Sequence, residues 1–189
     1  DKPKAIDKKD SPDDFDTETK RINWWGKLES QWKKAFNVLL GHAVTTKRPS
    51  DPELQAILRT KKLSFAPNSR NALTFKLTNL SGLRYLNELS MLNLSDQSIN
   101  SLRGLKYLTA LRTFNGSKNN LLHLANLSNL KELRSIDLSY NGLSFKDIAT
   151  FMRHMPPNLN KLDLRNNNFN TNEKKEIRQL LESVEKTMI

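Results

Sequence analysis

The chain has 189 residues, no cysteine and a formal net charge of +11 at neutral pH. This length is enough for one or two domains with a sizeable core, which would bury about 70% of the surface of the unfolded chain. The lack of cysteine excludes disulfide bonds, thiolate metal sites and cysteine catalysis. No run of about 18 apolar residues occurs, so the sequence predicts no membrane-spanning helix.

The first 20 residues are almost wholly charged or polar. Such a segment cannot bury enough apolar surface to fold, so residues 1–20 are predicted to be a disordered tail. Its closely spaced acidic residues invite a calcium-binding interpretation. However, an EF-hand loop counted from Asp14 would place Thr19 where glycine belongs and Trp25 where glutamate belongs. The tail is therefore interpreted as a solvated tether.

An amphipathic pattern follows the tail. Apolar side chains recur at steps of three and four, among them Trp25, Trp32, Phe36 and Leu39, and predict one helix over residues 22–42. Trp24 lies off this apolar stripe and is expected to be partly exposed. Two tryptophans and a phenylalanine on one stripe suit either a cap on a neighbouring domain or a helix that binds a membrane surface or a partner.

A second helix is predicted to begin at Ser50, because a serine, a proline and two acidic residues follow one another there. Residues 21–60 are therefore expected to form one helical unit. We favour its interpretation as an N-terminal cap, since a repetitive domain otherwise exposes apolar side chains at its first repeat.

One sequence pattern recurs from residue 63 to residue 169. The template L-x-x-L-x-L-x-x-N-x-L advances by 22 residues in its central copies and by longer steps at both ends. Each L-x-L suits a short strand, and leucines at steps of three suit a tight return segment. The extra residues of the last step fall in residues 146–155, which are predicted to be a helix. Five strands are predicted, beginning near Lys62, Met91, Thr113, Ser135 and Lys161.

This pattern resembles the leucine-rich repeat (LRR), and the 22-residue copies are most similar to the bacterial internalin-like subclass, here with a Trp-rich helical N-terminal cap. The resemblance implies an α/β fold, a right-handed solenoid of about five parallel strands with helical caps at both ends. Residues 61–170 are expected to form the repeats, and residues 171–189 a C-terminal capping helix.

A polar ladder is predicted at the loop corner of the repeats. An amide side chain both donates and accepts hydrogen bonds, so it can satisfy backbone groups at a buried bend. The predicted ladder residues are Asn68, Gln97, Asn119, Asn141 and Asn167.

No constellation of residues points to catalysis. The three histidines, His42, His123 and His154, stand apart from one another, and neither H-E-x-x-H nor a glycine-rich phosphate loop occurs. The sequence therefore predicts no enzyme, no catalytic residue, no metal site and no cofactor.

Strand side chains that alternate with the buried leucines are expected to line the concave face of the solenoid. In the families that the sequence resembles, this face binds protein. Most of these side chains are small and polar, and Tyr140 is the main aromatic anchor. A face without a specific ligand is the alternative. The predicted partner-binding residues are Met91, Asn93, Asp96, Asn115, Lys118, Asp137, Tyr140, Asp163 and Arg165.

The resemblance implies a noncatalytic, monomeric protein–protein interaction module, and the net charge favours a protein partner with an acidic surface. The basic residues, such as Arg84, Arg103 and Lys106, are scattered over the return segments. We expect no aromatic side chains interleaved with them for base stacking, which makes nucleic acid the less favoured partner.

Two other functions stay open, a basic polyanion- or nucleic-acid-binding protein and a scaffold fragment of a larger surface protein. The chain begins at Asp1 rather than methionine. We expect an extracytoplasmic location, either secreted or at a bacterial cell surface, with a cytoplasmic location as the alternative.

Overall fold

The computed structural model describes residues 17–67, 75–122, 124–125 and 127–182. The predicted ladder residue Asn68 and most of the predicted tail lie outside the described residues. The chain folds as two compact units, Asp1–Ile57 and Leu58–Ile189. Within the described residues, no helix is both long and apolar enough to cross a bilayer.

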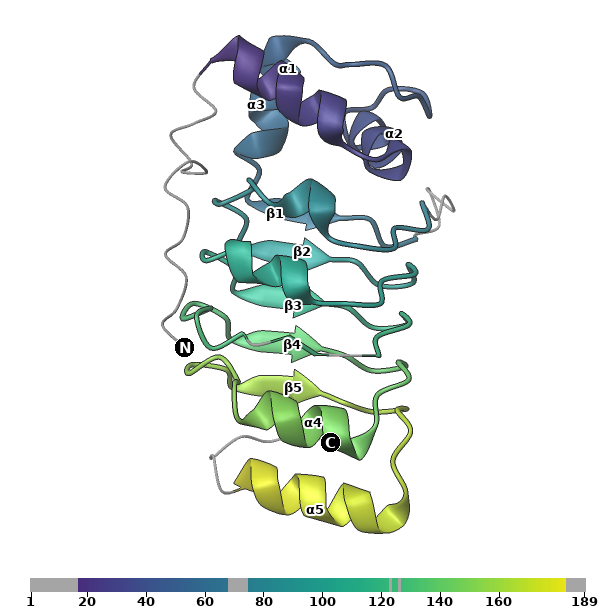
Figure 1. Ribbon diagram of the computed structural model, residues 1–189, viewed down its shortest axis with the longest axis vertical. Coiled ribbons are helices and arrows are strands. Elements are labelled where there is room, and N and C mark those ends of the chain that lie inside the picture. The colour runs from purple at the N-terminus through teal and green to yellow at the C-terminus, as the bar shows by residue number, and fades with distance from the viewer. Residues whose placement is uncertain (1–16, 68–74, 123, 126, 183–189) are drawn as a thin grey trace. The chain divides into compact units, whose positions relative to one another are not determined.

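The first unit contains the helices α1 (Glu18–Lys27), α2 (Ser30–Leu39) and α3 (Asp51–Leu58) (Figure 1). The prediction of one continuous helix over residues 22–42 is wrong, because Leu28 and Glu29 adopt extended backbone conformations that separate α1 from α2. The side chain of Thr17 caps α1. Helical structure therefore begins before residue 20, where the sequence predicts the tail to end.

Aromatic side chains form the core of this unit. The expected exposure of Trp24 is also wrong, because its side chain is only 4% exposed and its ring lies 5.8 Å from the Phe36 ring. Leu39, by contrast, is 41% exposed although it lies on the predicted apolar stripe. The break between α1 and α2 explains both differences, since a single helical projection cannot describe two helices with different axes.

Polar contacts join the three helices of the first unit. Arg21 is buried, and its guanidinium donates from Nε and Nη2 to the two carboxylate oxygens of Asp51 at the start of α3. This hydrogen bond holds the pKa of Asp51 below its usual value. Asn37 on α2 donates to the backbone carbonyls of Thr45 and Lys47, which ties the loop before α3 to α2.

The second unit is built on one parallel sheet whose strands lie in chain order. The strands begin at the five predicted residues, and neighbouring strands pair without any slip in register. They are β1 (Lys62–Ser64), β2 (Met91–Asn93), β3 (Thr113–Asn115), β4 (Ser135–Asp137) and β5 (Lys161–Asp163).

The central side chain of every strand points into the core, and its two neighbours point to the opposite face. These central residues share one row of the sheet, and burying each one contributes about 1.5–3 kcal/mol. They are Leu63, Leu92, Phe114, Ile136 and Leu162.

Return segments on the other side of this core connect the strands. They include the short 3₁₀ helices η3 (Ser81–Leu83) and η4 (Arg103–Tyr107), which bury their leucines at steps of three. The longer fourth return segment forms the predicted helix, α4 (Phe145–Met152), which starts with a capping box between Ser144 and Asp147. The last helix, α5 (Thr171–Glu182), buries Ile177 and Leu181.

Polar ladder side chains join consecutive repeats. Asn119 is buried, and its Oδ1 accepts a hydrogen bond from the backbone nitrogen of Ile99 while its Nδ2 donates to the carbonyl oxygen of Leu94. Both of these groups belong to the preceding repeat. Asn141 is also buried and bonds in the same way one repeat later.

The amide groups of Gln97 and Asn167 continue the ladder in both directions. Gln97 accepts from the backbone nitrogen of Leu77 and donates to the carbonyl of Phe65. Asn167 accepts from Leu143 and donates to Leu138. Backbone groups at these corners thus find partners without water, which a buried bend requires.

A glycine compensates for a larger side chain in the third repeat. Phe114 stands where the other strands carry leucine or isoleucine, and Gly116 stands where the neighbouring repeats carry Leu94 and Leu138. A Cβ atom on Gly116 would lie 2.7 Å from the Phe114 ring. The ring therefore occupies the space that the glycine leaves.

Candidate interaction surface

The outward side chains of the strands form two straight rows, which we call the sheet face. Because the strands pair in register, the first row runs from Lys62 to Lys161 and the second from Ser64 to Asp163. The sheet face contains the predicted residues Met91, Asn93, Asn115, Asp137 and Asp163.

Side chains of the second row are held by the backbone that follows them. In Asn93, Asn115, Asp137 and Asp163, Oδ1 accepts a hydrogen bond of 2.9–3.0 Å from the backbone nitrogen two residues further on. This local bond fixes each side chain at the end of its strand. The row is therefore a preorganised surface rather than a set of freely rotating groups.

Two serines that follow this row are buried. Ser117 and Ser139 donate their hydroxyl groups to Asn115 and Asp137. Simple strand alternation would place these hydroxyls on the surface, but the chain bends away at this point to reach the loop corner. The accessible surface therefore consists of the second row and the corner residues, without the two serines between them.

The corner residues of four repeats share a left-handed backbone conformation. Asp96, Lys118, Tyr140 and Asn166 all have φ between 53° and 58°. Backbone hydrogen bonds between repeats impose this conformation, for example from the Lys118 nitrogen to the Ser139 oxygen. Aspartate and asparagine tolerate it, whereas other side chains raise the energy by about 1–2 kcal/mol.

Tyr140 is the most exposed aromatic anchor of this surface. Its side chain is 55% exposed, and the Lys118 ammonium lies 5.9 Å from the centre of its ring. A bulky side chain in a left-handed conformation is unfavourable for folding, so its presence here needs an explanation other than stability.

An ion pair fixes Arg165 beside this tyrosine. Its guanidinium donates to both oxygens of Asp163, with 2.5 Å between Nη2 and Oδ2. The hydrogen bond from Arg165 lowers the pKa of the Asp163 carboxyl group. Asp163 in turn raises the pKa of Arg165, with smaller effects of Asp137 and Tyr140. The predicted residues Asp137, Tyr140, Asp163 and Arg165 therefore form one polar group.

Replacing Asp163 with asparagine is expected to lower the thermal unfolding midpoint more at pH 7 than at pH 2. Asparagine keeps the Oδ1 acceptor and removes the charge that binds Arg165. Because the folded-state pKa of Asp163 lies below its ordinary value of 3.8, the pair stabilises the fold above that value, and this stability is lost as the pH falls through the folded-state pKa.

Thermal unfolding of the parent and of Asp163→Asn from pH 7 to pH 2 checks this expectation. Asp96→Asn is the matched control, since Asp96 is exposed and asparagine suits its left-handed backbone. A midpoint difference for Asp163→Asn that stays constant across the whole pH range would contradict the assignment.

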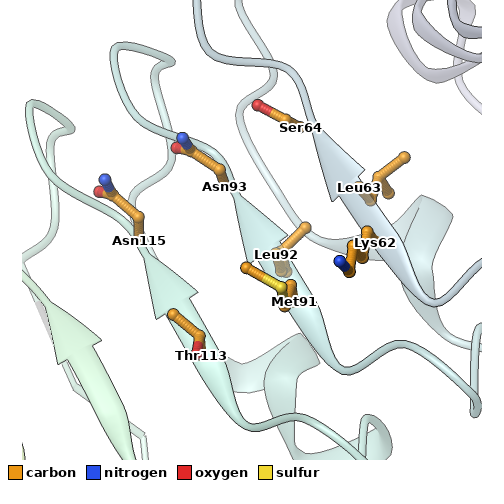
Figure 2. A pocket seen from close by; sticks show the side chains of 8 residues that line it. All are labelled: Lys62, Leu63, Ser64, Met91, Leu92, Asn93, Thr113 and Asn115. Atoms are coloured by element: carbon orange, nitrogen blue, oxygen red, sulfur yellow. The ribbon is translucent and has the colours of Figure 1, made fainter.

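A shallow hollow of about 410 Å³ lies over β1, β2 and β3. Figure 2 shows Ser64, Asn93 and Asn115 side by side at the ends of these strands, and Lys62, Met91 and Thr113 nearer their starts. Met91 is 43% exposed and offers an adaptable apolar contact. The predicted list omits Lys62, Ser64 and Thr113, although strand alternation places them on this face.

The return segments carry aromatic residues that the sequence interpretation missed. The expectation that no aromatic side chains interleave with the basic residues is wrong. Arg84 lies over the rings of Tyr85 and Tyr107, at 5.5 Å and 5.2 Å from their centres, and Lys106 lies 5.0 Å from the Tyr107 ring. The signal was present as two tyrosines 22 residues apart, each preceded by a basic residue.

In the part of the chain that the structure describes, no three histidine, aspartate or glutamate side chains gather closely enough to hold a metal ion.

Comparison with known proteins gives no matching family model and no matching curated protein.

Solved structures do match. An LRR protein of Leptospira interrogans is similar to the chain with 26% sequence identity and a TM-score of 0.54, and the match covers 76% of this chain and 34% of that one. Internalin C2 of Listeria monocytogenes is 21% identical over 72% of this chain and 64% of its own, with a TM-score of 0.44. TLR13, in its complex with ssRNA13, is 33% identical over 46% of this chain and 13% of its own, with a TM-score of 0.41.

The chain thus spans about a third of the length of the Leptospira protein. The likeness to that structure agrees with the sequence repeat of this chain and with its five parallel strands in one register. The chain has the leucine-rich repeat fold.

Proposed function

We propose that the chain is a noncatalytic protein-binding module, and that its partner docks on the sheet face and the adjoining corner residues. The predicted binding residues contribute to two neighbouring areas of this surface. Met91, Asn93 and Asn115 line the hollow over β1–β3, and Tyr140, Asp137 and the Asp163–Arg165 pair form the polar group further along. Asp96 and Lys118 are the corner residues that follow β2 and β3.

The exposed ring of Tyr140 is the observation that carries this proposal. Tyrosine is the residue type that most often dominates binding energy at protein interfaces, together with tryptophan and arginine. Here the ring stands 55% exposed, at a backbone conformation that asparagine would adopt more easily. Selection for binding accounts for a tyrosine at this position, whereas selection for stability would favour the asparagine found at Asn166.

The net charge of the chain suits a partner with acidic patches. The chain carries a net charge of +11, which attracts an acidic protein over several ångströms before contact. Held carboxylates such as Asp137 and Asp163 then require basic or hydrogen-bonding groups at matching positions of the partner. The long-range attraction thus favours a partner that is acidic overall, and the held carboxylates favour one with basic or hydrogen-bonding groups at the contact.

We extend the proposal to location. The 22-residue copies resemble those of bacterial internalin-like proteins, so the module belongs outside the cytoplasm, either secreted or at the cell surface. Fractionation of the source cells with an antibody against the chain tests this part, and a purely cytoplasmic signal would contradict it.

Replacing Tyr140 with asparagine is expected to weaken partner binding at least tenfold, or about 1.4 kcal/mol, without loss of stability. Asparagine removes the ring and suits the left-handed backbone. The partner is isolated by affinity capture, and its dissociation constant is then measured by titration against the parent and the variant.

Tyr107→Leu is the matched control, because it removes an exposed tyrosine from the return side of the same unit. We expect this control to bind the protein partner as the parent does. Parent-like affinity of Tyr140→Asn, combined with weak binding by Tyr107→Leu, would place the interface on the return side and overturn the proposal.

A further inference from the structure

Four side chains on the return side form a tyrosine–cation cluster, which consists of Arg84, Tyr85, Lys106 and Tyr107. Arg84 is the residue directly after η3, and Tyr107 is the last residue of η4. The Arg84 guanidinium lies over both tyrosine rings, and the Lys106 ammonium lies over the Tyr107 ring. The cluster therefore spans two consecutive repeats.

The repeat itself builds this cluster. Tyr85 and Tyr107 occupy equivalent positions 22 residues apart, and so do Arg84 and Lys106. Gly104 lets the two return segments approach each other, because a Cβ atom at this position would lie 2.4 Å from the Cβ of Leu80. This close approach brings Arg84 of one repeat within reach of Tyr107 of the next.

The cluster presents positive charge to solvent. Arg84 and Lys106 are both exposed, and Arg103 lies one turn before Lys106 and is also exposed. Among the described residues, no carboxylate forms an ion pair with Lys106 or Arg103. Lys106 and Arg103 are thus available to a ligand that carries several negative charges.

The rings hold the cations in place. A cation over an aromatic face is attracted by the negative face of the ring, and the planar guanidinium of arginine stacks well on such a face. Fixing a long side chain upon binding otherwise costs conformational entropy. The tyrosines therefore prepare Arg84 and Lys106 for a ligand before it arrives.

The same geometry argues against base stacking and against a dry protein interface. Single-stranded nucleic acid is held by aromatic faces on which bases stack, but the Tyr107 ring already faces two cations. Protein interfaces need a buried apolar or aromatic anchor, and Tyr107 is only 38% exposed. Cations held over rings in this way suit a ligand that is recognised through its charge.

We propose that the tyrosine–cation cluster binds an anionic polysaccharide through the sulfate or carboxylate groups of the sugar chain. This surface is separate from the sheet face, so the protein has two binding surfaces of different chemistry. The polysaccharide would concentrate the protein at an anionic surface, and the sheet face would remain accessible to the protein partner.

The test uses a short heparin oligosaccharide as the probe and compares two double variants of equal charge. Arg84→Gln with Lys106→Gln is expected to weaken heparin binding about tenfold. Arg134→Gln with Lys161→Gln removes the same charge at the starts of β4 and β5, and it is expected to reduce binding less than threefold. Equal losses in the two double variants would show that only the net charge matters and would overturn the proposal.

A second pair of variants tests the role of the rings at constant charge. Tyr107→Leu is expected to weaken heparin binding about threefold, because the cations lose their platform. Tyr107→Phe keeps the ring and is expected to bind as the parent does. Equal binding of both would show that the ring does not position the cations, which overturns this mechanism.

Competing probes decide the class of ligand. A thymidine oligonucleotide and a polyglutamate peptide, each with the same charge as the heparin fragment, are expected to bind at least tenfold more weakly than heparin. Tighter binding of the oligonucleotide or of the peptide would assign the cluster to nucleic acid or to acidic protein and overturn the polysaccharide. Thermal unfolding of every variant verifies that it folds. If Tyr107→Leu does not fold, the comparison of the two double variants alone decides whether the cluster binds heparin.

Discussion

Replacing Phe36 with alanine is expected to lower the free energy of unfolding of the first unit by about 3–5 kcal/mol. We call this unit, which contains α1 and α2, the helical unit. The Phe36 side chain is fully buried, and its ring lies 5.5 Å from the Trp32 ring and 5.8 Å from the Trp24 ring. Rigid indole rings cannot close the cavity that the substitution leaves, so most of the lost contact is not recovered.

Intrinsic tryptophan fluorescence measures this effect selectively, since all three tryptophans of the chain lie in the helical unit. Denaturant titration of Phe36→Ala should show a midpoint well below that of the parent. Leu39→Ala is the matched control on the same helix, because Leu39 is 41% exposed, and it should lose less than about 1 kcal/mol. Equal midpoints for the two variants would contradict the assigned core.

The same titration tests the predicted N-terminal cap. If residues 21–60 cover the first repeat, unfolding of the helical unit exposes its leucines, and the circular dichroism transition of the repeats should move together with the fluorescence transition. If the repeats unfold at the parent midpoint while the fluorescence transition shifts, the helical unit is a separate element and the cap prediction is wrong.

Replacing Asn119 with leucine is expected to lower the free energy of unfolding by at least about 3 kcal/mol. The amide satisfies the backbone nitrogen of Ile99 and the carbonyl oxygens of Leu94, Gly116 and Ser117. Leucine has a similar volume but no polar group, and each backbone group left without a partner in the buried corner costs about 1–3 kcal/mol.

Asn120→Leu is the control for Asn119→Leu, because Asn120 is the next residue, carries the same side chain and is exposed. Its substitution should change the stability by less than about 0.5 kcal/mol. Chemical denaturation followed by circular dichroism measures both variants. Equal stability of the two would mean that the hydrogen bonds of the ladder do not hold the repeats together.

The sequence by itself determined the parts that repeat. All five strands begin at the predicted residues, and α4 forms where the extra residues of the fourth step predict a helix. Local periodicity is sufficient here, because each repeat places its leucines and its ladder amide at the same spacing and can bury them only against the next copy. The same alternation placed Met91, Asn93, Asn115, Asp137 and Asp163 on one face of the sheet.

Other features depend on contacts between residues that are distant in sequence, and only the tertiary structure decided them. Trp24 is buried because a two-residue break separates α1 from α2 and changes the direction of the chain. A projection onto one continuous helix therefore does not predict which side chains of this segment are buried. Close packing at Gly104 placed Arg84 over the Tyr107 ring of the next repeat. Backbone hydrogen bonds between repeats forced Tyr140 into a left-handed conformation. Periodicity records which side chains are buried, whereas these arrangements follow from how neighbouring segments meet.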